Sequence, residues 1–157
     1  MGKADQAASY FRQGYACSQS VLMAFAEQFG LAPELAERVA SGFGGGIGRT
    51  GRTCGAVSGA VMVLGLAYAG NFATEGSAAK EQMYARVRQF FAEFQQLHGS
   101  LDCNTLLCVD IATAEGRSQA REQGKFSSLC PLLVGDAVRI VEKMIAEASL
   151  PVAPPAS

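Results

Sequence analysis

Apolar side chains along this chain recur every three or four residues, the spacing that lines one face of an α-helix. A first stripe consists of Cys17, Val21, Phe25 and Phe29. A longer stripe consists of Met83, Val87, Phe90, Phe94 and Leu97, and Tyr84 and Phe91 widen it. No alternating run of β-branched residues, which would indicate a half-buried strand, exceeds four positions. The pattern therefore predicts an all-α fold.

Glycines, prolines and capping residues set the expected limits of the helices. The first five predicted helices are Ala4–Gln13, Ala16–Phe29, Glu34–Ser41, Cys54–Ala69 and Glu75–His98. The next one follows an Asp102 cap and contains Leu106, Leu107, Val109 and Ile111. Pro131 opens the last one, which carries Val134, Val138, Val141 and Ile145 on one face. Gly116 is the expected point at which the helix after Asp102 bends or breaks. Residues Gly42–Thr53 are expected to form a glycine-rich loop.

The segment Cys54–Ala69 has 16 residues and carries no charge. A membrane-spanning helix needs about 20 predominantly apolar residues, so the segment favours a buried helix over a membrane span. Gly55 and Gly59 stand four apart, as do Ala56 and Ala60, and small residues at this spacing allow a neighbouring helix to approach closely. We therefore expect a compact helical bundle around this central Gly/Ala-rich apolar helix.

The length of 157 residues is about that of one domain, and no internal repeat divides it. Three of the five prolines fall in the last seven residues. We therefore expect a single all-α domain over residues 1–149 and a Pro-rich disordered tail over residues 150–157.

A formal net charge of −1 excludes the basic patch that nucleic-acid binding requires, and it excludes a polybasic membrane anchor. Charged residues make up 17% of the chain, against about 25% in an ordinary soluble domain. This deficit favours a homodimer that covers part of the surface. Residues Met1 to Gln19 lack the apolar core of a signal peptide, so we expect a cytoplasmic protein whose cysteines stay reduced.

Four of the five cysteines fall at the starts of predicted helices: Cys17, Cys54, Cys103 and Cys130. The partial positive charge of a helix N-terminus stabilises a thiolate, which is the form that attacks disulfides and binds metals. The placement favours one shared chemical site, although any single cysteine is more often an ordinary core residue. Cys108, five residues after Cys103, points to a different face of its predicted helix and is expected to be a core residue.

The glycine-rich loop carries two imperfect nucleotide motifs. Gly46–Gly51 matches GxGxxG, and the stretch read on to Thr53 matches a phosphate-binding loop with Arg in place of Lys. Both motifs require a preceding strand, which the pattern does not supply, so no nucleotide is expected. Gly45, Gly46 and Gly55 are instead candidate cofactor-binding residues, because glycine lets the backbone approach a bound centre closely.

Two arginines of the loop, Arg49 and Arg52, precede Cys54. They are candidate cofactor-binding residues that add positive potential at the start of its helix, and solvated loop charges are an equally good interpretation. His98 is the only histidine. It could join Cys103 in a mixed ligand set, but a cation near a helix C-terminus is favourable in itself, and that interpretation is preferred.

Three stretches carry a resemblance to a known family: Gly14-Tyr15-Ala16-Cys17-Ser18-Gln19-Ser20-Val21, then Gly44-Gly45-Gly46-Ile47 leading to Cys54-Gly55-Ala56-Val57-Ser58-Gly59, then Cys103 and Cys130. Over roughly residues 10 to 146 the chain resembles the C_GCAxxG_C_C family of redox-active proteins, which have four recurring cysteines and a CGAxxG motif. The resemblance implies a redox role for these four cysteines and leaves the substrate open. A similar domain in split-Soret cytochromes implies an iron–sulfur site as one option, whereas the absence of CxxCH excludes covalent haem attachment.

Three hypotheses remain open at this point. In the first, the four cysteines perform thiol–disulfide redox chemistry: Cys54 attacks a disulfide or oxidant, another cysteine resolves the mixed disulfide, and the partner is a redox protein or a small thiol or oxidant. In the second, all four thiolates bind an iron–sulfur cluster or zinc, for electron transfer or for structure. In the third, the chain is a non-catalytic dimeric scaffold with cysteines in its core.

Overall fold

The computed structural model describes residues 1–148, and every regular element in that range is helical. The α-helices are α1 (Lys3–Arg12), α2 (Cys17–Ala26), α3 (Pro33–Ala40), α4 (Gly55–Tyr68), α5 (Phe72–Glu75), α6 (Ser77–His98), α7 (Cys103–Leu107), α8 (Ala114–Glu122) and α9 (Cys130–Ala148). Two short 3-10 turns, η1 (Glu27–Phe29) and η2 (Ser41–Phe43), and one π-helical turn, η3 (Lys125–Leu129), extend them. The predicted all-α fold is confirmed, and the predicted tail over 150–157 lies outside the described residues.

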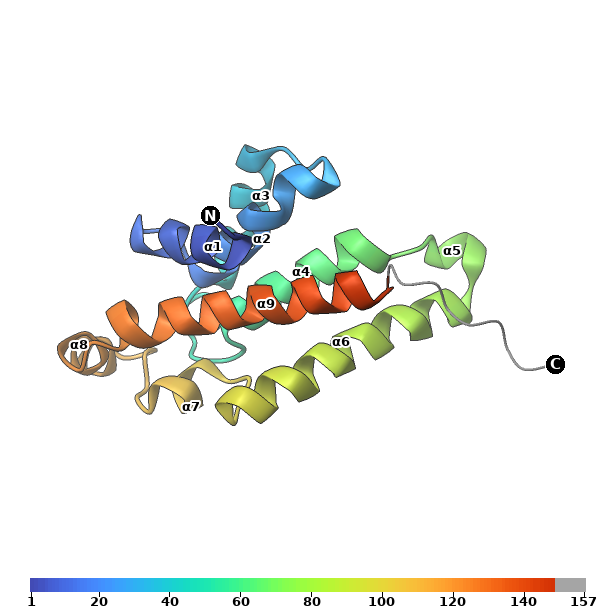
Figure 1. The fold of residues 1–157 in the computed structure, drawn as a ribbon. Coiled ribbons are helices and arrows are strands. Elements are labelled where there is room, and N and C mark those ends of the chain that lie inside the picture. The colour runs from blue at the N-terminus through green and yellow to red at the C-terminus, as the bar shows by residue number, and fades with distance from the viewer. Residues whose placement is uncertain (149–157) are drawn as a thin grey trace.

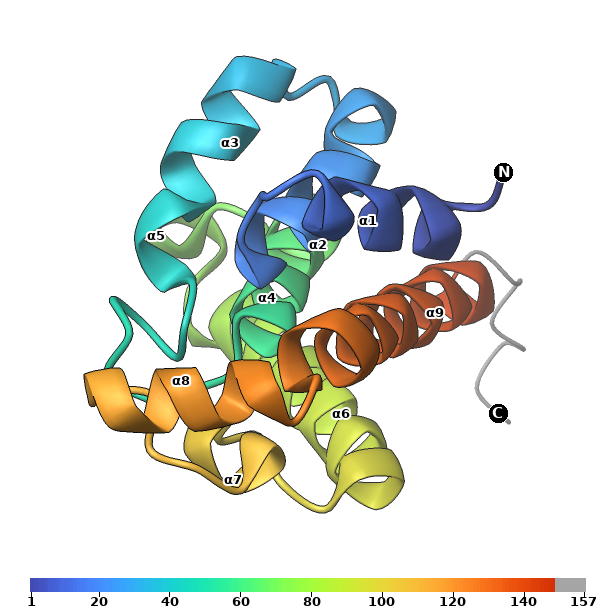
Figure 2. The ribbon, with the colours of Figure 1, turned by 90° about the vertical axis from the view of Figure 1, so that its left-hand side faces the viewer.

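The helix α4 packs against α2, α6 and α9, and α1 packs against α2 and α9. Helices α1, α2 and α3 lie on one side of α4 and α9, and α6 lies on the other side (Figure 1). The short helices α7 and α8 lie near the N-terminal end of α9 (Figure 2). Within residues 1–148, no helix is both long enough and apolar enough to cross a membrane.

The largest core cluster joins the long helices. Phe25 of α2 and Phe90 and Phe94 of α6 are fully buried, together with Val63 of α4 and Met144 of α9. Burying a large apolar side chain contributes roughly 1.5–3 kcal/mol. This cluster fixes the position of α4, and therefore the position of the residue that precedes it, Cys54.

Most predicted helix limits agree with the structure to within three residues. Gly30 and Gly99 end their helices with left-handed backbone, at φ 66° and 83°, as C-terminal glycines commonly do. The helix predicted over Glu75–His98 begins at Ser77. The short helix α5 precedes it, capped by the Asn71 side chain, which accepts hydrogen bonds from Ala73 and Thr74.

The long apolar stripe of α6 is only partly buried. Met83, Phe90 and Phe94 face the core, but Tyr84 and Leu97 are 46% and 62% exposed. The Tyr84 ring packs edge-on against Phe72 of α5 at the surface, with ring centroids 6.4 Å apart. Leu97 lines a surface depression instead of the core. The expectation that these two residues widen and extend the core stripe was therefore wrong.

The helix predicted after Asp102 is shorter than expected. The Asp102 side chain caps it as predicted, accepting a hydrogen bond from the Thr105 N–H at 3.2 Å. It ends at Leu107, because Cys108 adopts left-handed backbone at φ 59°. The predicted break at Gly116 was therefore wrong, since Gly116 lies inside α8, where its lack of a side chain lets the Asp110 carbonyl approach closely.

Pro131 does not open the last helix. Helical backbone already runs through η3, and Cys130 has helical dihedrals at φ −57° and ψ −42°. A proline inside a helix has no N–H to donate and crowds the carbonyl four residues earlier. The wider π-helical turn directly before Pro131 is the local adjustment that accommodates it. The prediction that Cys130 sits at a helix N-cap was therefore wrong.

Candidate functional site

Four cysteines line a single cavity with a volume of about 100 Å³. Cys17 comes from the first turn of α2, Cys54 from the cap of α4, Cys103 from the first turn of α7 and Cys130 from α9. The rest of the lining is apolar or small: Phe11, Ala16, Gly45, Gly55, Leu106, Leu107, Phe126 and Leu133. Thiols that are far apart in the sequence therefore share one apolar cavity.

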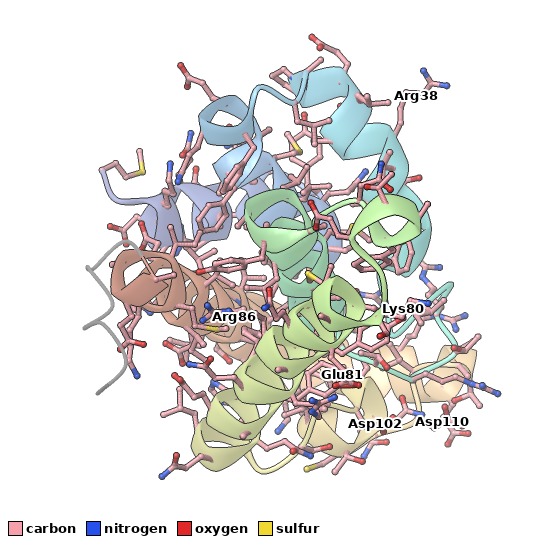
Figure 3. The ribbon with its side chains drawn as sticks, turned by 90° about the vertical axis from the view of Figure 1, so that its right-hand side faces the viewer. Arg38, Lys80, Glu81, Arg86, Asp102 and Asp110 are labelled. Carbon is pink, nitrogen blue, oxygen red and sulfur yellow. The ribbon has the colours of Figure 1, made fainter. Side chains whose placement is uncertain are left out.

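Backbone hydrogen bonds hold two of the cysteines in place. The Cys54 N–H donates to the Leu101 carbonyl at 2.8 Å, and the Cys103 N–H donates to the Arg52 carbonyl at 2.6 Å. Between them, Thr53 and Asp102 form an isolated antiparallel bridge. The end of the glycine-rich loop is thereby paired with the segment that leads into α7. Figure 3 labels Asp102 next to Asp110, in the lower part of the view.

Two glycines let backbone come close to cysteine side chains. A Cβ atom placed on Gly46 would lie 2.8 Å from Cβ of Cys103, and one placed on Gly55 would lie 3.0 Å from Cβ of Cys17. Gly46 also has left-handed backbone at φ 70°, which a side chain disfavours. Gly46, which belongs to the apparent nucleotide motif, and Gly55 therefore both serve close packing around the thiols.

Residues next to Cys17 fix the start of α2. The hydroxyl of Ser18, which is completely buried, donates to the Ala40 carbonyl at 2.8 Å. Gln19 accepts a hydrogen bond from the Ala16 N–H at 2.9 Å and donates to the Glu37 carbonyl at 2.9 Å. Both side chains tie α2 to α3, a role that no pattern in the sequence indicated.

Burial opposes ionisation at two of the thiols. Desolvation raises the pKa of Cys54 to about 11, although hydrogen bonds from the Ala56 and Val57 N–H groups partly offset it. Desolvation, with the neighbouring Cys54, Cys130 and Asp102 charges, raises the pKa of Cys103 to about 12. The pKa values of these two thiols are therefore raised, where their place at a helix start led us to expect lowered values, because the removal of a thiolate from water is the largest contribution.

The other two thiols shift in opposite directions. The Cys17 thiol acts as a hydrogen-bond donor to the Cys130 sulfur, and this interaction lowers the pKa of Cys130 despite its burial. The same interaction, followed by burial and the nearby cysteines, raises the pKa of Cys17. Cys130 is therefore the thiol of this cavity that is most readily present as a thiolate.

The remaining candidate residues lie around or outside this cavity. Gly45 and Gly55 line it, whereas the exposed Arg49 lines a neighbouring cavity and the exposed Arg52 lines neither. Nε2 of His98 lies 3.0 Å from Oδ2 of Asp136, away from the cysteines.

The prediction that Cys108 is a core residue was wrong. Its side chain is exposed, and its sulfur donates to the Thr105 carbonyl at 3.5 Å. The left-handed backbone that ends α7 turns it away from the cavity.

A single bound metal ion does not match the geometry. Among residues 1–148, no group of three or more His, Cys, Asp or Glu side chains is placed to hold one metal ion. All five cysteines are free thiols. A structural zinc site needs four ligands within about 2.3 Å of one point.

A family model described as "Putative redox-active protein (C_GCAxxG_C_C)" matches residues 15–144, which is most of the chain. This range contains all four cysteines of the cavity. No curated protein and no solved structure gives a match.

Proposed function

Since the chain belongs to this C_GCAxxG_C_C family, we propose that it is a thiol–disulfide redox protein in which Cys17 and Cys130 form the exchanging pair. The observation that carries the proposal is the convergence of four cysteines on one apolar cavity. Within it, the Cys17 donor favours the thiolate of Cys130, and the thiolate is the attacking form. Cys130 therefore replaces Cys54 as the expected nucleophile, because burial raises the pKa of Cys54 to about 11.

The exchange proceeds in two steps. In the first, the Cys130 thiolate forms a bond to one sulfur of a substrate disulfide, the substrate S–S bond breaks, and the first half leaves as a thiolate that takes the proton of Cys17. In the second, the Cys17 thiolate attacks the Cys130 sulfur, and the second half leaves and takes a proton from water. The protein loses two electrons and gains a Cys17–Cys130 disulfide, while the substrate disulfide becomes two thiols.

Cys54 and Cys103 keep their protons during this exchange, because burial holds their pKa values well above neutral pH. Their thiols form part of the uncharged wall of the cavity.

The test is the oxidation of the fully reduced protein by glutathione disulfide, followed by thiol counting and disulfide mapping by mass spectrometry. We expect the loss of two free thiols and a Cys17–Cys130 disulfide. Cys17→Ser or Cys130→Ser should abolish this disulfide, and the matched control Cys108→Ser, outside the cavity, should keep it. A different dominant pair, or no loss of cavity thiols, would contradict the proposal.

An iron–sulfur cluster is the second candidate, and the number of thiols favours it. Four thiols surround the cavity, whereas thiol exchange needs two. Four cysteines are the common donor set of a cluster, and the Ala56 and Val57 N–H groups directed at Cys54 would stabilise its thiolate. Bound through Cys17, Cys54, Cys103 and Cys130, a cluster would supply one-electron transfer.

One anaerobic preparation separates the two candidates, when iron, labile sulfide and free thiols are measured on the same sample. The thiol–disulfide proposal expects five free thiols and no stoichiometric iron. Stoichiometric iron and sulfide, with visible absorption that Cys17→Ser removes, would instead support the cluster.

A further inference from the structure

A second, larger cavity adjoins the cysteine cavity. Its volume is about 610 Å³, and Ala16, Gly45 and Phe126 line both cavities. Ala16 directly precedes Cys17 in the chain, and Phe126 lies four residues before Cys130. The shared wall therefore stands next to both members of the proposed exchanging pair.

Three arginines line this larger cavity: Arg49 from the glycine-rich loop, and Arg117 and Arg121 from α8. The two arginines of α8 are four residues apart and so share one face of the helix. No aspartate or glutamate lines the cavity, and none of the three arginines forms an ion pair with a carboxylate of residues 1–148. Three cations without a counter-charge repel one another, and a bound anion would relieve that repulsion.

One of the arginines, Arg117, is held in place before any ligand binds. The Arg117 guanidinium donates from one nitrogen to the carbonyls of Ile111 and Ala112, at 2.9 and 3.1 Å. Arg49 packs against Gly45, where an added Cβ would lie 2.8 Å from Cγ of Arg49. Fixing a donor in advance reduces the entropy lost when a ligand binds.

We propose that this arginine cavity binds the carboxylates of a small anionic thiol or disulfide and directs its sulfur towards Cys17 and Cys130. The planar guanidinium matches a carboxylate through two parallel hydrogen bonds. A volume of about 610 Å³ lies within the range of small-molecule sites, about 300–1,000 Å³, and suits the charged part of such a ligand. The apolar cysteine cavity, about 100 Å³, suits its uncharged sulfur.

The choice of a sulfur-containing ligand rests on the proposed thiol–disulfide function, so carboxylate binding and oxidation are tested separately. The binding probe is S-methylglutathione, whose two carboxylates are intact and whose sulfur cannot exchange. Calorimetric titration of the reduced protein should show binding that weakens with added salt. The double variant R49Q/R121Q should weaken binding about tenfold or more, since each charge-assisted hydrogen bond contributes to affinity.

The matched control is R38Q/R88Q, which removes the same two charges from exposed positions on α3 and α6. Arg38 is labelled on α3 in Figure 3, away from Asp102 and Asp110 at the α7 end. This control should bind S-methylglutathione as the natural protein does. Equal weakening in both double variants would mean that overall charge, and not the arginine cavity, attracts the ligand, and would overturn the inference.

The oxidation arm compares two disulfides. Rate constants for forming the Cys17–Cys130 disulfide are measured with glutathione disulfide, which is anionic, and with bis(2-hydroxyethyl) disulfide, which is neutral. The ratio of the two rate constants should fall about tenfold in R49Q/R121Q and stay constant in R38Q/R88Q. An unchanged ratio in R49Q/R121Q would overturn the inference.

The binding and oxidation experiments distinguish a failure of the arginine cavity inference from a failure of the proposed thiol–disulfide function. If S-methylglutathione binds through the arginines but neither disulfide oxidises the cysteines, the carboxylate site stands and the thiol–disulfide function fails. If the neutral disulfide oxidises Cys17 and Cys130 but S-methylglutathione does not bind, the function stands and the arginine cavity inference fails.

Discussion

The two halves of the cysteine cavity are built in different ways. Cys54 and Cys103 are held by backbone hydrogen bonds to Leu101 and Arg52, and burial raises the pKa of both thiols. Cys17 and Cys130 are free thiols whose side chains form a hydrogen bond with each other, and this hydrogen bond moves their pKa values in opposite directions. One half of the cavity is therefore suited to holding its shape and the other to reacting.

This difference shows that position on a helix does not by itself determine thiol acidity. Cys54 caps α4 and is approached by the Ala56 and Val57 N–H groups, yet its pKa rises. Cys130 lies within a continuous helical run and has a lowered pKa, because one neighbouring thiol donates to it. A single directed donor outweighs burial at Cys130, whereas two backbone donors do not outweigh it at Cys54.

The largest expected effect concerns the half of the cavity that contains Cys54 and Cys103. Gly46→Ala should destabilise the fold by about 3 kcal/mol, because the new methyl group would collide with the Arg52 nitrogen and with Cβ of Cys103. Gly48→Ala is the control: its backbone is also left-handed, at φ 62°, but nothing lies within 4 Å of the added atom. It should cost about 1 kcal/mol. Urea unfolding measures both, and equal losses would show that Gly46 is not a packing position.

The next prediction compares the reactivity of Cys130 with that of Cys54 and Cys103. At pH 8, iodoacetamide should modify Cys130 on the order of 100 times faster than Cys54 or Cys103, because the rate follows the thiolate fraction. Mass spectrometry of each cysteine peptide gives the rates. Rates at Cys54 and Cys103 should still be rising at pH 10, and a plateau below pH 9 at either would contradict the assigned difference.

The stability of the protein above pH 9 should depend on the raised pKa of Cys54. The pKa of Cys54 is about 11 when folded, so above the ordinary pKa of 9.0 the unfolded thiol loses its proton while the folded thiol keeps it. The contribution to stability is complete below pH 9 and is lost as the pH rises through about 11. By pH 10.5 the natural protein should lose roughly 2 kcal/mol more than Cys54→Ala, relative to pH 8. Parallel unfolding curves over this range would contradict the prediction.

The smallest expected effect concerns Cys17, the hydrogen-bond donor to Cys130. Cys17→Ala removes the hydrogen bond to Cys130, so the pKa of Cys130 should rise and its alkylation rate at pH 7 should fall about tenfold. Cys17→Ser keeps a donor and should restore most of the rate. The pH–rate profile of Cys130 in the two variants is the measurement, and identical profiles would assign the lowered pKa to another cause.

The sequence predicted the helices well wherever the local signal was strong. Gly30 and Gly99 end helices as expected, and Asp102 caps α7. It failed where neighbours decide the outcome: Cys108 ends α7 early in a left-handed conformation, and helical backbone runs through Pro131. The single domain over residues 1–149, the homodimer and the cytoplasmic location stay predictions.

For the site, the sequence indicated the four cysteines, but it did not indicate the arginines of α8. Arg117 and Arg121 lie on a polar helix whose pattern is that of a solvated surface. Their contribution to a cavity depends on α8 lying near the glycine-rich loop, about 70 residues earlier in the chain.

The sequence by itself determined that this chain is helical and that Cys17, Cys54 and Cys103 stand at helix starts, because periodicity, capping and glycine placement act over a few residues. Only the tertiary structure decided which thiol is acidic and which thiols are neighbours. Desolvation and hydrogen bonding act across space, and the residues that impose them on Cys130 and Cys54 come from other turns of the fold.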